Sequence, residues 1–348
     1  MKINRILFIP AACLALSLTT ISCDSEGDDN VQWWDWGTVQ EDPEAPSEPE
    51  EPVDTEANPE IVALGWTNQT AALAEQYGEI PEYIQVYKSP ATLCDKNAYA
   101  YIAVADFAQV TLDVLGDAES LKTPSTRYEE SLAPIVVNGG FFYQTSLSLI
   151  VRDGQLICPN TQVDSPDWSE TYYYMPRGTF SILQDGTVDV SWVYTQTEWY
   201  GGKTYAYPIP MPLENGRVPE ANYPEGGKEY TGKTGIGGGP VLTKGGTIIN
   251  SWEDEFLNIN PEDNRPRTAI GYNPTANRLV LFACAGDNTE SVSGLTLENT
   301  ANVLLALGCT ESVNLDGGGS TVMLFNGNEI IKPSGGEQRT VGSCAAFK

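Results

Sequence analysis

The sequence predicts an α/β fold of mixed α+β character, in which a central mixed β-sheet is flanked by helices within a single large domain. The first observation is that short apolar runs bounded by Gly, Asn or Asp recur after residue 60, as strands do. The second is a segment with the apolar spacing of a helix between two such runs, which gives a βαβ pattern. The third is size, since a chain of 348 residues, 41% of them hydrophobic, can bury a large core.

Short apolar runs predict the strands of the sheet. They are Tyr99–Ala105, Pro134–Val137, Thr179–Leu183, Val188–Val193, Val241–Leu242, Ala269–Tyr272, Arg278–Cys284, Ser312–Leu315 and Thr321–Phe325. Asp185-Gly186 and Asn326-Gly327 lie between strand-like runs, and dipeptides of this kind form tight hairpin turns. We therefore predict one hairpin at each dipeptide.

The clearest helix prediction begins at Thr296 and ends at Gly308. Apolar residues at 297, 301, 304 and 305 fall on one face of such a helix. Thr296 can act as the N-cap, and Gly308 can end the helix. With the runs on either side, this helix predicts a parallel βαβ unit. Cys284 and Cys309 would then lie at opposite ends of their strands and remain unbridged.

The N-terminus has the residue order of a secretory signal. Two basic residues precede an apolar run, residues 6–18, that is too short to span a bilayer. Ser22-Cys23 then resembles the lipobox of bacterial lipoproteins, in which the Cys is acylated. We therefore predict a lipoprotein signal peptide at residues 1–22 and lipidation at Cys23. The alternative is an ordinary signal peptide followed by an incidental Cys.

Residues 23–60 are predicted to be an acidic disordered tether, with the folded domain at residues 61–348. From residue 24 to residue 60 there are 14 Asp or Glu and no Lys or Arg, so little apolar surface can be buried. We expect an exported lipoprotein of the outer membrane, facing the periplasm or the cell surface. It would contact the membrane only through its lipid anchor.

The composition excludes several classes of function. The chain has 47 Asp and Glu against 19 Lys and Arg, a formal net charge of −28, which repels nucleic acid. It has no His, which excludes Ser-His-Asp and Cys-His catalysis and histidine-bearing metal sites. No CxxC spacing occurs, so a metal cluster is not expected, and the cysteines after residue 60 are predicted to be mostly buried thiols.

Four glycine-marked segments are the candidates for chemistry. They are Val137–Phe142, Ile236–Leu242, Pro266–Gly271 and Val313–Ser320. Glycines after a strand let a ligand approach the backbone amides, which suit an anionic group. Each segment taken alone is also compatible with an ordinary tight turn. None fits a Walker A loop, because no Gly-Lys-Ser/Thr follows.

Taken together and in this order, the segments resemble the phosphodiester glycosidase family over roughly residues 85–347. The Asn-Leu-Asp-Gly-Gly-Gly-Ser run at 314–320 is the most specific part, and Pro333-Ser334 and Arg339-Thr340-Val341 are similar to the family's closing segment. The resemblance implies a hydrolase that removes N-acetylglucosamine, or a related sugar, linked through its anomeric carbon to a phosphodiester. The chain has Ala285-Gly286-Asp287 where the family has Asp-Gly-Arg, and Asn299 where it has Glu.

The site that follows from these residues is built on carboxylates and arginines. Asp316 is predicted to be the nucleophile or general base, with Asp287 and Glu337 as second choices. Arg267 and Arg339 are predicted to bind phosphate. The other predicted substrate-binding residues are Asn138, Gly139, Gly238, Gly239, Thr268, Asn314, Gly317, Gly318, Gly319 and Ser320.

No cofactor is required by this chemistry and no metal ligand is assigned, although clustered acids could hold Ca²⁺. We expect a monomer whose partner is a sugar-phosphate or glycan substrate. A different class of function stays open, a noncatalytic surface glycan-binding lipoprotein, which the departure at residues 285–287 favours. Residues 164–230 carry 13 aromatics that could stack on sugars or pack beneath long loops.

Overall fold

The computed structural model describes residues 58–164, 171–214, 216–249, 251–255, 257, 259–286 and 291–348. Residues 54–348 form one compact unit. Helix α1 (Pro59–Ala63) begins two residues before the predicted start of the domain, and the buried Asn58 donates from Nδ2 to Tyr87 Oη at 2.6 Å. The predicted signal peptide, most of the predicted tether and Cys23 lie outside the described residues.

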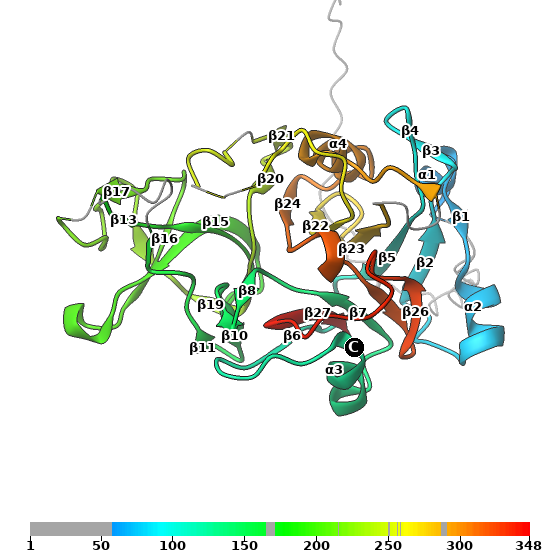
Figure 1. Ribbon diagram of the computed structural model, residues 1–348, viewed down its shortest axis with the longest axis horizontal. Helices are drawn as coiled ribbons and strands as arrows, with labels where there is room; N and C mark the ends of the chain where they lie inside the picture. Colours follow the sequence, from blue (N-terminus) through cyan, green and yellow to red (C-terminus); the bar gives the residue numbers. More distant parts are fainter. Residues whose placement is uncertain are drawn as a thin grey trace, which may run out of the picture. The chain divides into compact units, whose positions relative to one another are not determined.

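The predicted α/β fold is wrong, because the chain is mostly β (Figure 1). The α-helices of the described residues are only α1, α2 (Thr70–Tyr77), α3 (Pro124–Ser131) and α4 (Leu297–Ala306). None of these helices is long and apolar enough to cross a bilayer. The sheets are also not mixed, since all strand pairs between described residues are antiparallel. The sheet faces pack mainly on one another, so flanking helices are not needed to cover them.

The largest sheet has eight strands and carries most of the candidate site. Its order is β1 (Thr67–Asn68), β2 (Ile84–Lys88), β5 (Ala100–Asp106), β23 (Arg278–Cys284), β22 (Arg267–Asn273), β24 (Glu311–Asn314), β20 (Val241–Lys244) and β21 (Thr247–Ile248). Helix α4 packs on one face through Leu297 and Leu304, which join Leu242 and Phe282 in a buried cluster. The opposite face, with Ile270 and its neighbours, faces the other sheets.

Two further sheets complete the main core. The seven-stranded sheet runs β11 (Gln155–Cys158), β10 (Ile150–Arg152), β19 (Gly232–Gly237), β14 (Arg177–Leu183), β15 (Val188–Thr195), β16 (Thr204–Tyr207) and β18 (Lys228–Glu229). The five-stranded sheet runs β26 (Asn328–Ile331), β25 (Met323–Phe325), β7 (Ile135–Asn138), β27 (Ser343–Phe347) and β6 (Leu112–Gly116). Phe180, Ile236, Ile135 and Phe347 from these sheets join Ile270 in one buried cluster, so the three sheets share a core.

Small sheets occupy the periphery. They are β12 (Val163–Asp164) with β13 (Tyr173–Tyr174) and β17 (Leu213–Glu214), β3 (Thr92–Leu93) with β4 (Lys96–Asn97), and β8 (Phe142–Tyr143) with β9 (Thr145–Ser146).

The predicted βαβ unit is present, and its two strands are parallel, but they are not neighbours in the sheet. Strands β23 and β24 both pair antiparallel with β22, so they run parallel to each other with β22 between them. Helix α4 is the connection between them, as predicted. Hydrophobic periodicity predicts that a strand, a helix and a strand follow one another along the chain. It does not predict which other strand lies between the two strands in the sheet.

Predictions of local structure were confirmed, although the predicted fold class was wrong. Helix α4 begins where expected, with Thr296 as N-cap accepting from Asn299 N at 3.0 Å, and Gly308 follows it with a φ of 81°. The Asp185-Gly186 turn joins β14 to β15, and Asn326-Gly327 joins β25 to β26. The described cysteines are unbridged, and all but the exposed Cys94 are buried, which confirms the prediction of mostly buried thiols.

Candidate active site

The four glycine-marked segments meet where strands β20, β22 and β24 of the eight-stranded sheet begin or end. Backbone hydrogen bonds join them in pairs: Asp316 N donates to Gly139 O (2.9 Å), Gly318 N to Pro266 O (2.9 Å) and Gly239 N to Asn314 O (2.7 Å). Because every segment touches the loop that follows β24, this loop is the centre of the arrangement. Segments far apart in the sequence therefore lie around Asp316.

Asn138, at the end of β7, holds this loop in place. It is fully buried, and its Nδ2 donates to Asp316 O at 2.6 Å. Its Oδ1 accepts from Thr268 Oγ1 at 2.6 Å and from Val322 N at 3.2 Å. Asn138 and Thr268 thus bind protein groups in this structure, and their geometry is that of a scaffold beneath Asp316.

Close backbone packing accounts for several of the glycines. A Cβ on Gly139 would lie 2.3 Å from Ser343 Oγ, and a Cβ on Gly238 would lie 2.3 Å from Asn314 O. Gly239 has a φ of 137°, and its Cβ would lie 2.9 Å from Glu255 Oε2. These positions require glycine because neighbouring chain segments approach so closely.

Gly318, in the loop after β24, has a different environment from these closely packed glycines. A Cβ on Gly318 would meet nothing within 4 Å, although its φ of 57° still favours glycine. This residue borders open space rather than a neighbouring strand. The Gly317 and Gly318 N–H groups already donate to Asp316 Oδ1 and Pro266 O, so a ligand in this space would meet the loop surface rather than the N–H groups of these two residues.

Asp316 is half-buried and has a perturbed acidity. Its Oδ1 accepts from Gly317 N at 2.9 Å. Burial raises the pKa of Asp316 to about 6, although Ser320, the Gly317 N–H and the Arg339 charge all oppose the rise. The buried Ser320 hydroxyl lies near this carboxylate, but its geometry falls short of a hydrogen bond. At neutral pH the carboxylate is mostly ionised, with a basicity suited to proton transfer.

Arg339 supplies the positive charge at this site. Its guanidinium packs on Gly319, where a Cβ would lie 2.6 Å from Arg339 Nη2. The side chain is exposed, and within the described part of the chain it has neither a hydrogen bond nor an ion pair. Its donors are therefore open to solvent, as an anion-binding group requires. They also lie near the ionisable Asp316 carboxylate.

Arg267 lies close to Asp316 in the sheet but binds elsewhere. The register that pairs Ala269 with Asn314 continues through the bond from Leu315 N to Thr268 O, which places Arg267 across from Asp316. Its guanidinium is buried, however, and donates to Leu295 O at 2.9 Å and to Asp263 O at 2.8 Å. These bonds fix the segments before α4, so the phosphate role of Arg267 stays a prediction.

The remaining predicted residues divide between scaffold and surface. Asn314 is buried, and its Nδ2 donates to Gly239 O at 2.9 Å. Glu337 is exposed two residues before Arg339, whereas Asp287 lies outside the described residues. Within the described ranges, no three His, Cys, Asp or Glu side chains gather into a group that could hold a metal ion.

Glu255 is a buried acid that the sequence reasoning missed. Its side chain is completely buried, and its carboxylate accepts from Gly178 N, Val241 N and Ser251 Oγ, each at 3.0 Å. Burial raises the pKa of Glu255 against these hydrogen bonds. The carboxylate thereby joins β14 to β20 next to Gly239. Its surroundings in sequence, Trp252-Glu253-Asp254-Glu255, read as a solvated loop, so no local pattern marks it.

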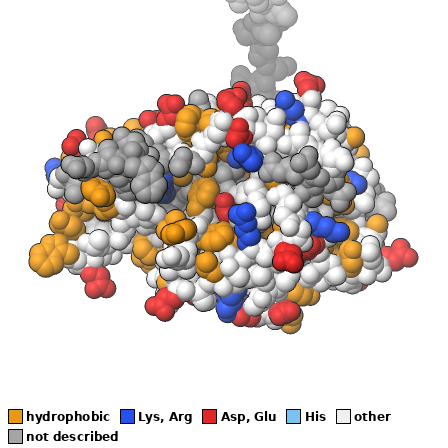
Figure 2. Space-filling model, viewed as in Figure 1, with side chains coloured by type: hydrophobic (Ala, Val, Ile, Leu, Met, Phe, Trp, Pro, Cys, Tyr) orange, Lys and Arg blue, Asp and Glu red, His pale blue; other side chains and the backbone are white. Residues whose placement is uncertain are grey.

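The aromatic segment contains both buried and exposed rings, so packing is confirmed for some of them and sugar stacking stays a prediction for the others. Tyr174, Tyr194, Tyr205 and Tyr207 form a buried cluster, which is packing. Other aromatics are exposed, namely Trp199 (89%), Tyr172 (51%) and Tyr200 (50%). Figure 2 shows hydrophobic side chains on the face of the region that holds β13, β16 and β17.

Comparison with family models places the chain among known proteins. A family model described as phosphodiester glycosidase matches residues 132–348, which include all the predicted catalytic and substrate-binding residues. No curated protein sequence matches the chain.

Solved structures share the fold at low sequence identity. A protein from Synechocystis superposes with a TM-score of 0.52 at 14% identity, covering 78% of this chain and 64% of that one, so the chain spans less than two thirds of its length. The catalytic domain of zebrafish N-acetylglucosamine-1-phosphodiester alpha-N-acetylglucosaminidase, auto-inhibited by its pro-peptide, gives 0.51 at 18% identity, covering 76% and 82%. An exported protein from Burkholderia pseudomallei gives 0.50 at 15%, covering 73% and 74%. At these identities the likeness shows the fold alone.

Proposed function

The chain belongs to the phosphodiester glycosidase family, as its motifs predicted, and on this premise we propose that it hydrolyses the anomeric bond of a sugar-1-phosphodiester. The observation that carries the proposal is the proximity of the Asp316 carboxylate and the Arg339 guanidinium. A half-buried carboxylate with a pKa of about 6 lies beside an exposed guanidinium, on the loop where four glycine-marked segments meet. This pairing suits a substrate that combines a reactive anomeric carbon with a phosphate.

The reaction breaks the bond between the anomeric carbon and the phosphate oxygen. Water adds its hydroxyl to the sugar, and the phosphate departs as an anion, so the released proton goes to solvent. Because the leaving oxygen belongs to an acidic phosphate, its departure needs less proton donation than an ordinary glycoside does. Arg339 would stabilise the charge that develops on it. Ionised Asp316 would act as the nucleophile or as the base that activates water.

The test is a panel of sugar-1-phosphodiesters, scored for released sugar. The panel varies the sugar with the aglycone held constant, and then the aglycone with the preferred sugar. Asp185→Asn, an exposed carboxylate in the β14–β15 turn, is the matched control for Asp316→Asn. Hydrolysis by the wild type and by the control, but not by Asp316→Asn, supports the proposal. Absence of hydrolysis across the panel counts against it.

The second candidate is a noncatalytic glycan-binding protein. It is favoured by Trp199, Tyr172 and Tyr200, whose exposed rings are suited to stacking on sugars. Binding of glycans by a wild-type protein that hydrolyses nothing would select this candidate. Loss of that binding in Trp199→Ala would assign it to these rings.

We further propose that the protein works at the cell envelope through a lipid on Cys23. The support is the sequence alone, a basic and apolar signal ending in Ser22-Cys23 and followed by an acidic stretch. In cells fed a labelled fatty acid, the wild-type protein should carry label and sediment with membranes. A Cys23→Ala protein that is still processed, labelled and membrane-bound would contradict this location.

A further inference from the structure

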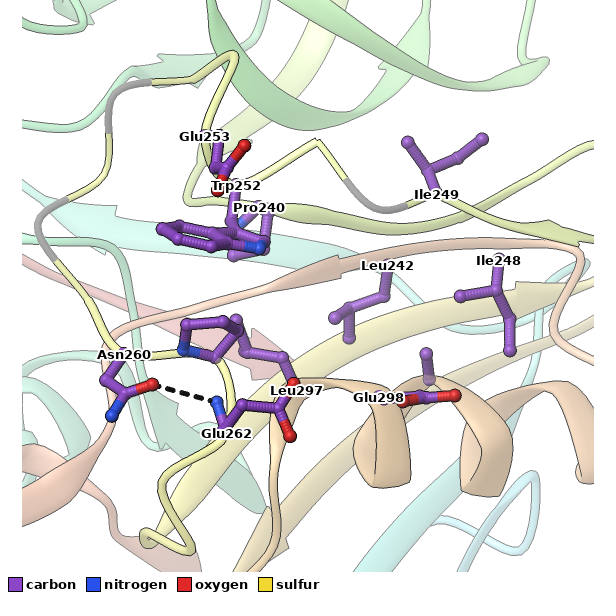
Figure 3. A pocket seen from close by; sticks show the side chains of 12 residues that line it. Pro240, Leu242, Ile248, Ile249, Trp252, Glu253, Asn260, Glu262, Leu297 and Glu298 are labelled. Atoms are coloured by element: carbon purple, nitrogen blue, oxygen red, sulfur yellow. Dashed lines mark hydrogen bonds between the residues drawn. The ribbon is translucent and has the colours of Figure 1, made fainter. Parts of the chain in front are cut away.

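A cavity of about 490 Å³ lies between α4, the β20–β21 hairpin and the loop segments 252–253 and 260–262 (Figure 3). Its lining is Pro240, Leu242, Ile248, Ile249, Trp252, Glu253, Asn260, Pro261, Glu262, Leu297, Glu298 and Ala301. None of these residues is among the predicted catalytic or substrate-binding residues, although Pro240 and Leu242 end one of the four glycine-marked segments. The volume is within the range of small-molecule pockets. This cavity is therefore a candidate for a second ligand.

The walls are fixed relative to each other. Leu297 N donates to Pro261 O at 3.1 Å, which ties the loop to the start of α4. Asn260 Oδ1 accepts from Glu262 N at 3.1 Å, the bond drawn in Figure 3. Ile249 N donates to Leu242 O at 2.9 Å and fixes the hairpin wall. A pocket held by such bonds is largely formed before a ligand enters.

The surface inside the cavity is divided about equally between apolar and polar atoms. Figure 3 shows Leu242 and Ile248 pointing from the hairpin towards α4, from which Leu297 contributes the facing wall. The half-buried Trp252 adds an aromatic ring beside Pro240. The apolar part of the lining suits an apolar ligand body, and the polar part suits a charged or hydrogen-bonding group.

All the charged side chains of the lining are carboxylates. Glu253, Glu262 and Glu298 are exposed at the cavity, and the lining contains no Lys or Arg. Three negative charges disfavour an anion, including the phosphate of the proposed substrate. They favour a cation, and a tryptophan ring attracts a cation as well. The cavity thus lacks the guanidinium that the Asp316 site has.

We propose that this cavity binds a small organic ammonium ion with an apolar body. The body lies against Leu242 and Leu297, and the ammonium group lies among the carboxylates within reach of the Trp252 ring. The two requirements are separable, since apolar contact alone predicts binding of a neutral molecule of the same shape. Charge alone predicts binding of any small cation.

The experiment uses probes that share one body and differ in charge. Phenethylammonium, 2-phenylethanol and 3-phenylpropanoate are titrated into the purified protein, and dissociation constants are measured by calorimetry. Methylammonium tests charge without a body, and a neutral methyl glycoside tests the sugar alternative. We expect phenethylammonium to bind about tenfold more tightly than 2-phenylethanol, since cation–π and carboxylate attraction together supply such a ratio. Equal binding of the alcohol, the anion or the glycoside would overturn the proposal.

Variants assign the binding to this cavity. Glu262→Gln with Glu298→Gln should weaken phenethylammonium about fivefold and leave 2-phenylethanol unchanged, because exposed ion pairs contribute modestly. Glu75→Gln, an exposed carboxylate on α2, is the matched control and should change nothing. Trp252→Leu should weaken both probes, and thermal unfolding checks that each variant is folded. Full affinity in both the Gln double variant and Trp252→Leu would place the binding elsewhere. Because no step of this test measures hydrolysis, it stands or fails independently of the proposed reaction.

Discussion

Asp316 and Glu255 are two acids of raised pKa that both lie beside glycine-marked turns, yet their surroundings differ. Asp316 is half-buried, bonded by one backbone amide and faced by the exposed Arg339. Glu255 is completely buried and saturated by three neutral donors from three chain segments. A raised pKa therefore marks burial in both cases, whereas solvent access and a free cation distinguish a reactive acid from a structural one.

The largest effect expected from this comparison is on turnover by Asp316→Asn. The substitution keeps the shape of the side chain but removes its charge, so hydrolysis of a sugar-1-phosphodiester should fall by about 10³-fold or more. Steady-state kinetics on the best substrate of the panel measures this. Near wild-type hydrolysis would move the chemistry to Asp287 or Glu337.

Glu255→Gln should instead act on stability. An amide offers only one acceptor oxygen and brings an NH₂ group against N–H donors, so the free energy of unfolding should fall by about 2–3 kcal/mol. Chemical denaturation measures it, with the exposed Asp254→Asn as the matched control. If Glu255→Gln unfolds like the wild type but loses turnover, the assignment of the two acids is reversed.

Arg339→Met should reduce kcat/KM by about tenfold to a hundredfold, because a charged contact to the departing phosphate is lost. It should also change the pH profile. In the wild type, kcat/KM should fall below a pH of about 6, where Asp316 gains its proton. Arg339 lowers the pKa of Asp316, so the variant should lose activity at a higher pH. An unchanged acidic limb would mean that Arg339 does not act on this carboxylate.

The last effect concerns the dependence of stability on pH. The folded pKa of Asp316, about 6, exceeds the ordinary value of 3.8 for an aspartate, so the fold disfavours the ionised form. This cost is absent below the unfolded pKa, grows between the two values and is complete above a pH of about 6. Asp316→Asn should therefore be more stable than the wild type by about 3 kcal/mol at pH 7, and equal to it at pH 3. A variant less stable than the wild type at pH 7 would show that the carboxylate stabilises the fold.

The sequence predicted what is encoded locally. The cap at Thr296, the stop at Gly308 and the turn at Asn326-Gly327 depend on a few consecutive residues, and each was confirmed. The fold class failed because an apolar run such as Thr179–Leu183 shows that a strand is covered, but not whether a helix or another sheet covers it.

The candidate site was predictable to a similar degree. The motifs identified the segments that meet around Asp316, because glycine is required wherever backbones approach closely. They did not separate Arg267, whose donors bind carbonyls, from Arg339, whose donors face solvent. The motifs also did not distinguish Glu255 from Glu253. Glu255 is buried and Glu253 is exposed because of contacts with strands that are distant in the sequence.

The position of β27 has a consequence for the order in which the protein is assembled. This strand is the last of the described strands in the chain, yet it lies inside the five-stranded sheet, between β7 and β6. Ser343 O also accepts from Gly139 N at 2.7 Å, beside the loop that carries Asp316. The ribosome adds residue 343 after every other residue of the site. A chain that is still being synthesised or exported therefore contains those residues but lacks the strand that positions them. Any activity of the site therefore begins only after synthesis has passed β27.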